Sequence, residues 1–255
     1  MDRLEFTSRL DERLQTDEYA DVDASANGLQ VGPETGAVEH VAFAVDAAVE
    51  TIEHAAERDA DVLVTHHGIS WGGIERVTGI DYQRIGTLLE NDLALYVSHL
   101  PLDGHQELGN AAGIADLLGL DERAPFGTHK GKYVGQRGTL PESASPQELA
   151  ETLAAELETG DQNVQVLDFG PEAIRDVAIV TGSGVDWLEE ASESGADVLV
   201  TGEGKQHAYH EARERKLNLV LAGHYATETF GVNALADLVE SWGLETTYIE
   251  CPTGL

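Results

Sequence analysis

One six-residue segment occurs twice in this chain, and this repetition limits the folds that the chain can adopt. Residues 60–65 and 196–201 both read Ala-Asp-Val-Leu-Val-Thr, 136 residues apart. The same offset aligns Val41-Ala42 with Val177-Ala178. Six identical residues alone could be common β-strand vocabulary, but the agreement of the flanking positions favours an internal duplication. We therefore expect two similar domains.

Apolar runs of strand length alternate with segments of helical spacing. Residues 40–46 form a candidate buried strand, residues 47–58 have apolar positions at helical spacing, and residues 61–65 form a second candidate strand. The same order restarts near Val177, after a less regular middle from about residue 125 to 170. Strands that alternate with helices indicate parallel sheets.

These patterns predict an α/β protein with two similar α/β domains and mostly parallel sheets. We expect the first domain to cover residues 1–125 and the second to cover residues 126–255. One option is that the C-terminal segment packs back on the first domain. With 42% hydrophobic residues among 255, the chain can bury a sizeable core.

The charge balance is strongly acidic. Asp and Glu number 47 against 15 Lys and Arg, so the formal net charge is −32. Such a surface repels phosphate backbones, which makes nucleic-acid binding an unfavourable interpretation. The acidic residues are spread along the chain and not gathered in a tail, which is typical of a protein from a salt-rich, halophilic cytoplasm where screening relaxes self-repulsion. An ordinary acidic protein is the alternative.

Other features of the sequence bear on location and redox chemistry. No apolar run approaches the roughly 20 residues of a membrane-spanning helix, and the start has no basic segment followed by an apolar one. We therefore expect a cytoplasmic protein. Cys251 is the only cysteine, so the chain can form no intramolecular disulfide and no thiolate-based zinc site.

Histidines and carboxylates follow three of the predicted strands. They are the pair His66-His67, the motif His99-x-x-x-Asp103 and the motif His224-x-x-x-Glu228. The carboxyl edge of an α/β sheet is where ligands gather, and these donors suit divalent cations, so we predict a metal site in the cleft between the domains. Alone, each group has a structural interpretation: hydrogen-bonded scaffolding, a helix cap, or a surface pair on one helical face.

Two further segments leave alternatives open. The run Thr181-Gly182-Ser183-Gly184 follows a strand, where its amides could hold an anion, although a tight turn explains it better. His207 and His210 follow the second copy of the repeat and could reach a substrate or face solvent. Ser70 and Cys251 complete no recognisable nucleophile triad.

Five motifs in order resemble those of the NIF-three-like dinuclear metal proteins, also known as GTP cyclohydrolase type 2 homologues. They are Asn27-Gly-Leu-Gln-Val-Gly32, Thr65-His-His-Gly68, Ser98-His-x-Pro-Leu-Asp103, Thr201-Gly-Glu203 and Gly223-His-Tyr-x-Thr-Glu228. The resemblance covers nearly the whole chain. It implies two related α/β domains with metals between them, and a toroidal homohexamer whose sites face an internal cavity.

The resemblance also implies roles for individual residues. It assigns two divalent ions per chain, zinc, manganese or iron, to His66, His67, Asp103, His224 and Glu228, with one carboxylate bridging. His99 also matches the family pattern, and we interpret it as a residue that orients Asp103. The chain lacks the long central insertion of some members, so no activity attributed to that insertion transfers.

A two-metal site of this kind favours a metal-dependent hydrolase that acts on a nucleotide or phosphoester-like small molecule. The candidate catalytic residues are Glu228, His207 and His210. The alternative is a non-catalytic, metal-stabilised hexameric scaffold or a regulatory interaction protein. A third interpretation, a single structural ion, predicts one metal per chain and loss of folding on chelation.

Overall fold

The computed structural model describes residues 1–160 and 162–255, which form two compact units. The first comprises Met1–Leu102 with Gly231–Cys251, and the second Asp103–Phe230 with Pro252–Leu255. The sequence placed the division near residue 125. In the structure it comes earlier, because helix α5 (Asn110–Leu117) contributes Ala111, Ile114 and Ala115 to the hydrophobic core of the second unit.

The first unit contains a five-stranded sheet in the order β1-β4-β3-β2-β11. Its strands are β1 (Gly28–Val31), β2 (His40–Asp46), β3 (Val62–His67), β4 (Ala94–Val97) and β11 (Glu245–Tyr248). All neighbouring pairs are parallel except β1 with β4. The C-terminal segment therefore returns to this unit, because β11 pairs with β2 in the register Glu245↔His40.

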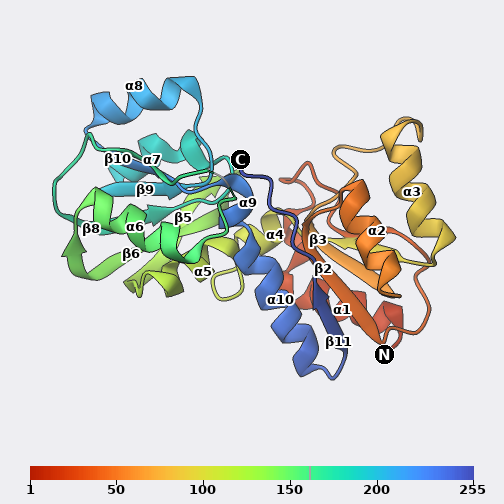
Figure 1. Ribbon diagram of the computed structural model, residues 1–255. Coiled ribbons are helices and arrows are strands. Elements are labelled where there is room, and N and C mark those ends of the chain that lie inside the picture. The colour runs from red at the N-terminus through yellow and green to blue at the C-terminus, as the bar shows by residue number, and fades with distance from the viewer. Residues whose placement is uncertain (161) are drawn as a thin grey trace. The chain divides into compact units, whose positions relative to one another are not determined.

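Alternating side chains of this sheet pack against different helices (Figure 1). Leu63 and Leu95 share a core with Ile52 and Leu88, which belong to α2 (Val49–Glu57) and α3 (Ile80–Glu90). The next residue of β4, Tyr96, donates its hydroxyl to Asp11 of α1 at 2.8 Å. The other helices that include residues of this unit are α1 (Arg3–Leu14), η1 (Thr16–Tyr19), α4 (Leu100–Asp103) and α10 (Thr229–Ser241).

The second unit contains a six-stranded mixed sheet in the order β5-β6-β8-β9-β10-β7. Its strands are β5 (Asp121–His129), β6 (Lys132–Ala144), β7 (Gln165–Leu167), β8 (Ile174–Ile179), β9 (Val198–Thr201) and β10 (Asn218–Leu221). The central strands β8, β9 and β10 are parallel, as the repeat predicts. The segment that the sequence left irregular adds the antiparallel strands β5, β6 and β7.

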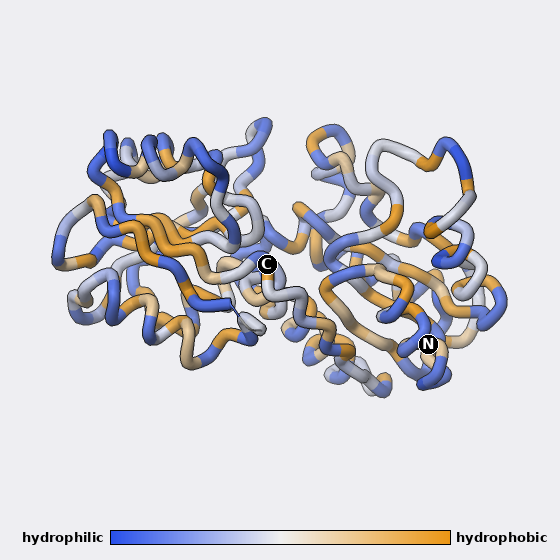
Figure 2. The backbone as a smooth tube through the Cα atoms, turned by 45° about the horizontal axis from the view of Figure 1, so that its top comes forward, coloured by the Kyte–Doolittle hydropathy of each residue, from blue (hydrophilic) through white to orange (hydrophobic). Residues whose placement is uncertain are grey.

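Helices cover both faces of this second sheet (Figure 1). The core on one face includes α5 and α6 (Pro146–Glu156), while α7 (Leu188–Glu193) contacts β9 and α8 (Gln206–Arg215) contacts β10. The short elements η2 (Gly184–Trp187) and α9 (His224–Thr227) complete the unit. Figure 2 shows hydrophobic residues concentrated along the strands of both units.

The two units repeat the same strand register, as an internal duplication requires. Val41 pairs with Val62 across β2 and β3, and Val177 pairs with Val198 across β8 and β9, at the sequence offset of 136. The aspartate of each copy also makes equivalent bonds. One carboxylate oxygen of Asp61 accepts the amides of residues 39 and 40, and one oxygen of Asp197 accepts those of residues 175 and 176.

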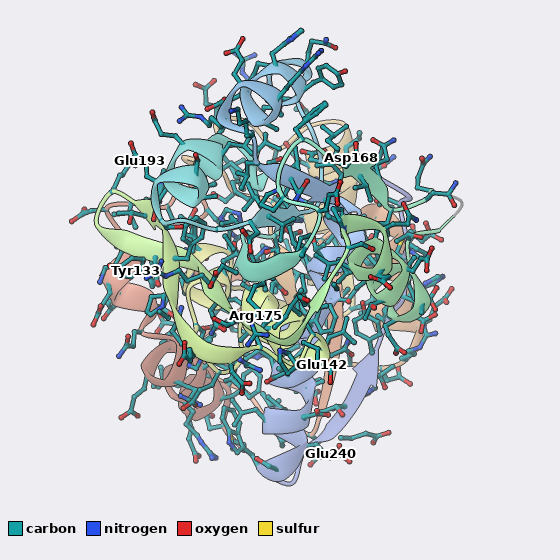
Figure 3. All side chains as sticks on the ribbon, turned by 90° about the vertical axis from the view of Figure 1, so that its left-hand side faces the viewer. Tyr133, Glu142, Asp168, Arg175, Glu193 and Glu240 are labelled. Carbon is teal, nitrogen blue, oxygen red and sulfur yellow. The ribbon has the colours of Figure 1, made fainter. Side chains whose placement is uncertain are left out.

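The acidic side chains lie on the surface, as their spread along the sequence predicts. Exposed carboxylates such as Glu193 and Glu240 project from the ribbon in Figure 3. Among the described residues, no helix has the length and apolar character needed to cross a membrane.

Candidate metal centre

Three imidazoles of the first unit converge at the carboxyl edge of its sheet. His66 and His67 end β3, and His99 follows β4. Because β3 and β4 are parallel and pair Thr65 with Val97, their last residues reach the same edge. The ring centroids of His66 lie 4.6 Å from His67 and 5.1 Å from His99. One ring nitrogen from each residue lies within 4.8 Å of the others, so the group could hold a metal ion.

Each of these imidazoles is held through its Nδ1 atom. Nδ1 of His66 donates to the carbonyl of Ser98 at 3.0 Å, and Nδ1 of His67 donates to Asp46 at 2.9 Å. Nδ1 of His99 donates to Asp23, also at 2.9 Å. An acceptor at Nδ1 fixes the neutral ring in the tautomer whose lone pair is on Nε2 and sets its orientation. Metal-binding histidines characteristically have such partners.

Asp23 is a buried anchor that the sequence interpretation missed, since it was grouped with the solvated acidic surface. Its side chain is only 2% exposed. Burial raises the pKa of Asp23, but hydrogen bonds and the charge of His99, with bonds from Asn27 and Ser25, outweigh burial and lower the pKa to about 2. Asp23 also accepts the amide of Leu100 at 2.9 Å, so it fixes the start of α4.

A second set of donors lies in the second unit, around α9. His224 is flanked by two carboxylates: its Nε2 is 3.3 Å from Glu228 Oε2, and its Nδ1 is 3.3 Å from Glu203 Oε1. Burial lowers the pKa of His224, but the bonds and charges of Glu228 and Glu203 dominate and raise it to about 9. The ring is therefore an imidazolium at neutral pH in the metal-free protein, and a metal cation would have to displace its proton.

Glu203 is a further contact that the sequence interpretation did not assign. It stands at the position that corresponds to His67 in the first copy, 136 residues earlier. The hydroxyl of Ser183 donates to its carboxylate and, together with His224, lowers the pKa of Glu203. The duplication could have indicated this residue, because it replaces a predicted ligand at an equivalent strand end.

Asp103 is a buried carboxylate, 8% exposed, in the same unit as His224. Its Oδ1 accepts the amide of Asn110 at 2.9 Å and the hydroxyl of Thr181 at 3.4 Å. Both donors are neutral groups, so they orient the carboxylate without cancelling its charge. A divalent cation would compensate the charge of such a buried carboxylate.

The glycine run after β8 serves the donors of the second unit. Gly182 has φ +58°, and a Cβ atom there would collide with Glu228 and lie 3.1 Å from His224 Nε2. Its amide donates to Thr227, and the amide of Gly184 donates to Thr201. These bonds use the amides within the fold, which favours the tight-turn interpretation over an anion cradle.

The two other candidate histidines lie elsewhere in the second unit. His207 and His210 are exposed on α8. Nε2 of His207 is 3.8 Å from Asp186, and the ring of His210 packs edge-on against Tyr209. In the part of the chain that the structure describes, neither belongs to a group of donors close enough to share an ion.

Comparisons with known proteins agree over the whole chain. The sequence model of the family described as Duf34/NIF3 (NGG1p interacting factor 3) matches residues 1–253. A Halobacterium salinarum protein named "GTP cyclohydrolase 1 type 2 homolog" is 57% identical over 255 residues, and a Pyrococcus abyssi protein of the same name is 44% identical over 257, each with both chains fully covered. The crystal structure of TTHA1606 from Thermus thermophilus is similar with a TM-score of 0.90 at 38% identity, again covering both chains fully.

Proposed function

Because this chain belongs to the Duf34/NIF3 family, as its five motifs predicted, we propose that it is a metal-dependent hydrolase with two divalent ions. The proposed ligands are His66, His67, Asp103, His224 and Glu228. The proposed substrate is a small nucleotide or phosphoester, in keeping with the name of its curated relatives.

The observation that carries this proposal is the anchoring of the imidazoles. His66, His67 and His99 all use Nδ1 for a hydrogen bond within the fold and have ring nitrogens close together. Such an arrangement costs conformational freedom and brings three polar rings together, which ligation of a cation explains. Nitrogen and carboxylate donors of this kind suit zinc, manganese and iron.

The buried carboxylates support the same proposal. Asp103 is 8% and Glu228 only 3% exposed, and burying an anion is costly unless a cation compensates it. A pair of divalent ions at such a site supplies Lewis acidity and a water activated near neutral pH. Asn110 and Thr181 would hold Asp103 in place, and Glu203 would orient His224.

The test is metal analysis of variants, with turnover measured on the same samples. We expect His66→Ala, Asp103→Ala and Glu228→Ala to lower the metal content per chain, because each removes a proposed ligand. His210→Ala, on the exposed face of α8, is the matched control and should keep the wild-type content. Undiminished metal in all three ligand variants would refute the proposal.

Turnover distinguishes the hydrolase from a metal-stabilised scaffold. The metal-loaded protein should cleave members of a panel of nucleotides and phosphoesters, and Glu228→Ala should abolish this cleavage. If the loaded protein cleaves none of them while the ligand variants lose assembly, the scaffold function replaces the hydrolase. The ratio of metal to chain separates two ions from a single structural ion.

A further inference from the structure

An exposed tryptophan lies against the histidine cluster of the first unit. Trp71 follows β3 by four residues, and its side chain is 45% exposed, whereas His66 beside it is fully buried. The indole meets the ring of His99 edge-on, with centroids 5.0 Å apart and planes at 78°, and its centroid is 6.1 Å from that of His67. A large aromatic surface is thus accessible at the candidate metal ligands.

The position of this indole is fixed by the backbone around it. Its Nε1 donates to the carbonyl of Gly68 at 3.2 Å, and residue 71 forms an antiparallel bridge with Ser25. On either side of it, the amide of Ala26 bonds the carbonyl of Ser70 and the amide of Gly72 bonds that of Ala24. A tethered ring loses little entropy when a ligand packs on it, which is the property of a preorganised binding surface.

We propose that Trp71 is the stacking platform for the purine ring of the substrate, a specificity residue beside the metal ligands. This proposal rests on the proposed function for the rest of the substrate, since it names the class of molecule that the same site takes. A purine is a fused bicyclic ring that matches the indole in size, and base–aromatic stacking is the usual way in which proteins hold an unpaired base.

The distances fit a single nucleotide-sized molecule. A ring stacked on Trp71 lies next to His67 and His99, so its sugar or phosphate can extend toward the same imidazoles. Carboxylates close to the cluster, Asp23 and Asp46, disfavour a highly charged anion at the ring end of the site. A neutral heteroaromatic ring is the group that an indole in such surroundings accepts best.

The test measures nucleoside binding without relying on turnover. Guanosine is the probe, with uridine as a smaller ring, ribose 5-phosphate as a ligand without a base, and choline as a cation that would use the indole differently. We expect guanosine to quench tryptophan fluorescence and to bind more tightly than uridine. Trp71→Ala should weaken guanosine binding about 5- to 150-fold, the range for loss of one stacked base.

Two substitutions separate stacking from general damage. Trp71→Phe keeps an aromatic face and should retain most of the guanosine affinity. Trp187→Ala is the matched control, because Trp187 also donates Nε1 to a backbone carbonyl, that of Thr128, and also lies edge-on to a histidine, His129, but belongs to the second unit. It should leave the guanosine affinity unchanged. Ribose 5-phosphate should bind Trp71→Ala and the wild type equally.

The outcomes also separate this proposal from the metal site. Trp71→Ala should keep the wild-type metal content, and His66→Ala should lose metal while guanosine still quenches its fluorescence. Wild-type affinity for guanosine in Trp71→Ala, binding of choline in place of guanosine, or no guanosine binding by the wild-type protein would each overturn the stacking role. Loss of the metal prediction alone would leave the guanosine result to decide it.

Discussion

Replacing Asp23 by Asn should destabilise the first unit and remove part of its acid sensitivity. Both oxygens of Asp23 accept two N–H groups: Oδ1 those of Ser25 and His99, and Oδ2 those of Asn27 and Leu100. An asparagine amide has only one acceptor oxygen, so in either orientation its NH₂ group would face two donors. The substitution therefore cannot preserve this network.

The size of the effect follows from the pKa of Asp23. Lowering it from 3.8 to about 2 corresponds to about 2 kcal/mol of unfolding free energy at neutral pH. Buried donors left without an acceptor add to this, typically about 1–3 kcal/mol each, although the two contributions overlap. We expect Asp23→Asn to lose about 2–4 kcal/mol at pH 7.

The pH dependence gives the sign of the same effect. A carboxyl whose pKa is depressed in the folded state stabilises the protein above its unfolded pKa and loses that contribution as pH falls through the folded value. The advantage of the wild type over Asp23→Asn should therefore be full above pH 4 and shrink between about pH 4 and pH 2.

Denaturant unfolding at a series of pH values measures both quantities. Asp21→Asn is the matched control, because Asp21 is an exposed acidic residue two positions away, and we expect it to change the unfolding free energy by less than about 0.5 kcal/mol. If Asp23→Asn were as stable as this control at pH 7, or if its deficit persisted undiminished to pH 2, the anchoring role of Asp23 would be wrong.

Three further predictions concern the second unit and the duplication. Gly182→Ala should reduce metal content while the protein stays folded, because its Cβ would displace Glu228 and approach His224; metal analysis with circular dichroism checks this, and wild-type metal content would contradict it. Asp61→Ala and Asp197→Ala should each destabilise the protein by about 1–3 kcal/mol, since each carboxylate accepts two equivalent backbone amides; denaturant unfolding should find similar losses, and a large difference between them would argue against equivalent roles. In the metal-free protein, the raised pKa of His224 gives stability that is full below pH 6.5 and lost as pH rises through about 9; His224→Gln should show no such loss in thermal unfolding across this window.

The sequence alone determined the repeated architecture and its family. Strand-length apolar runs such as Val62–Thr65 report burial directly, because a residue run that is apolar on both faces must lie inside a sheet. The identical run 136 residues later therefore predicted a second parallel strand, which β9 is. The residues His66 and His67 were also readable, since they follow such a run at the edge where ligands gather.

Tertiary structure decided the anchors and the unit division. Asp23 contacts His99 across 76 residues of chain, so its local sequence could only suggest a surface acid. Strand β11 joins the first sheet through its register with β2, which no local pattern specifies. Trp71 likewise belongs to the histidine cluster only because the backbone bridge to Ser25 places it there. Side-chain periodicity encodes burial along one element, whereas contacts between distant elements depend on how the whole chain packs.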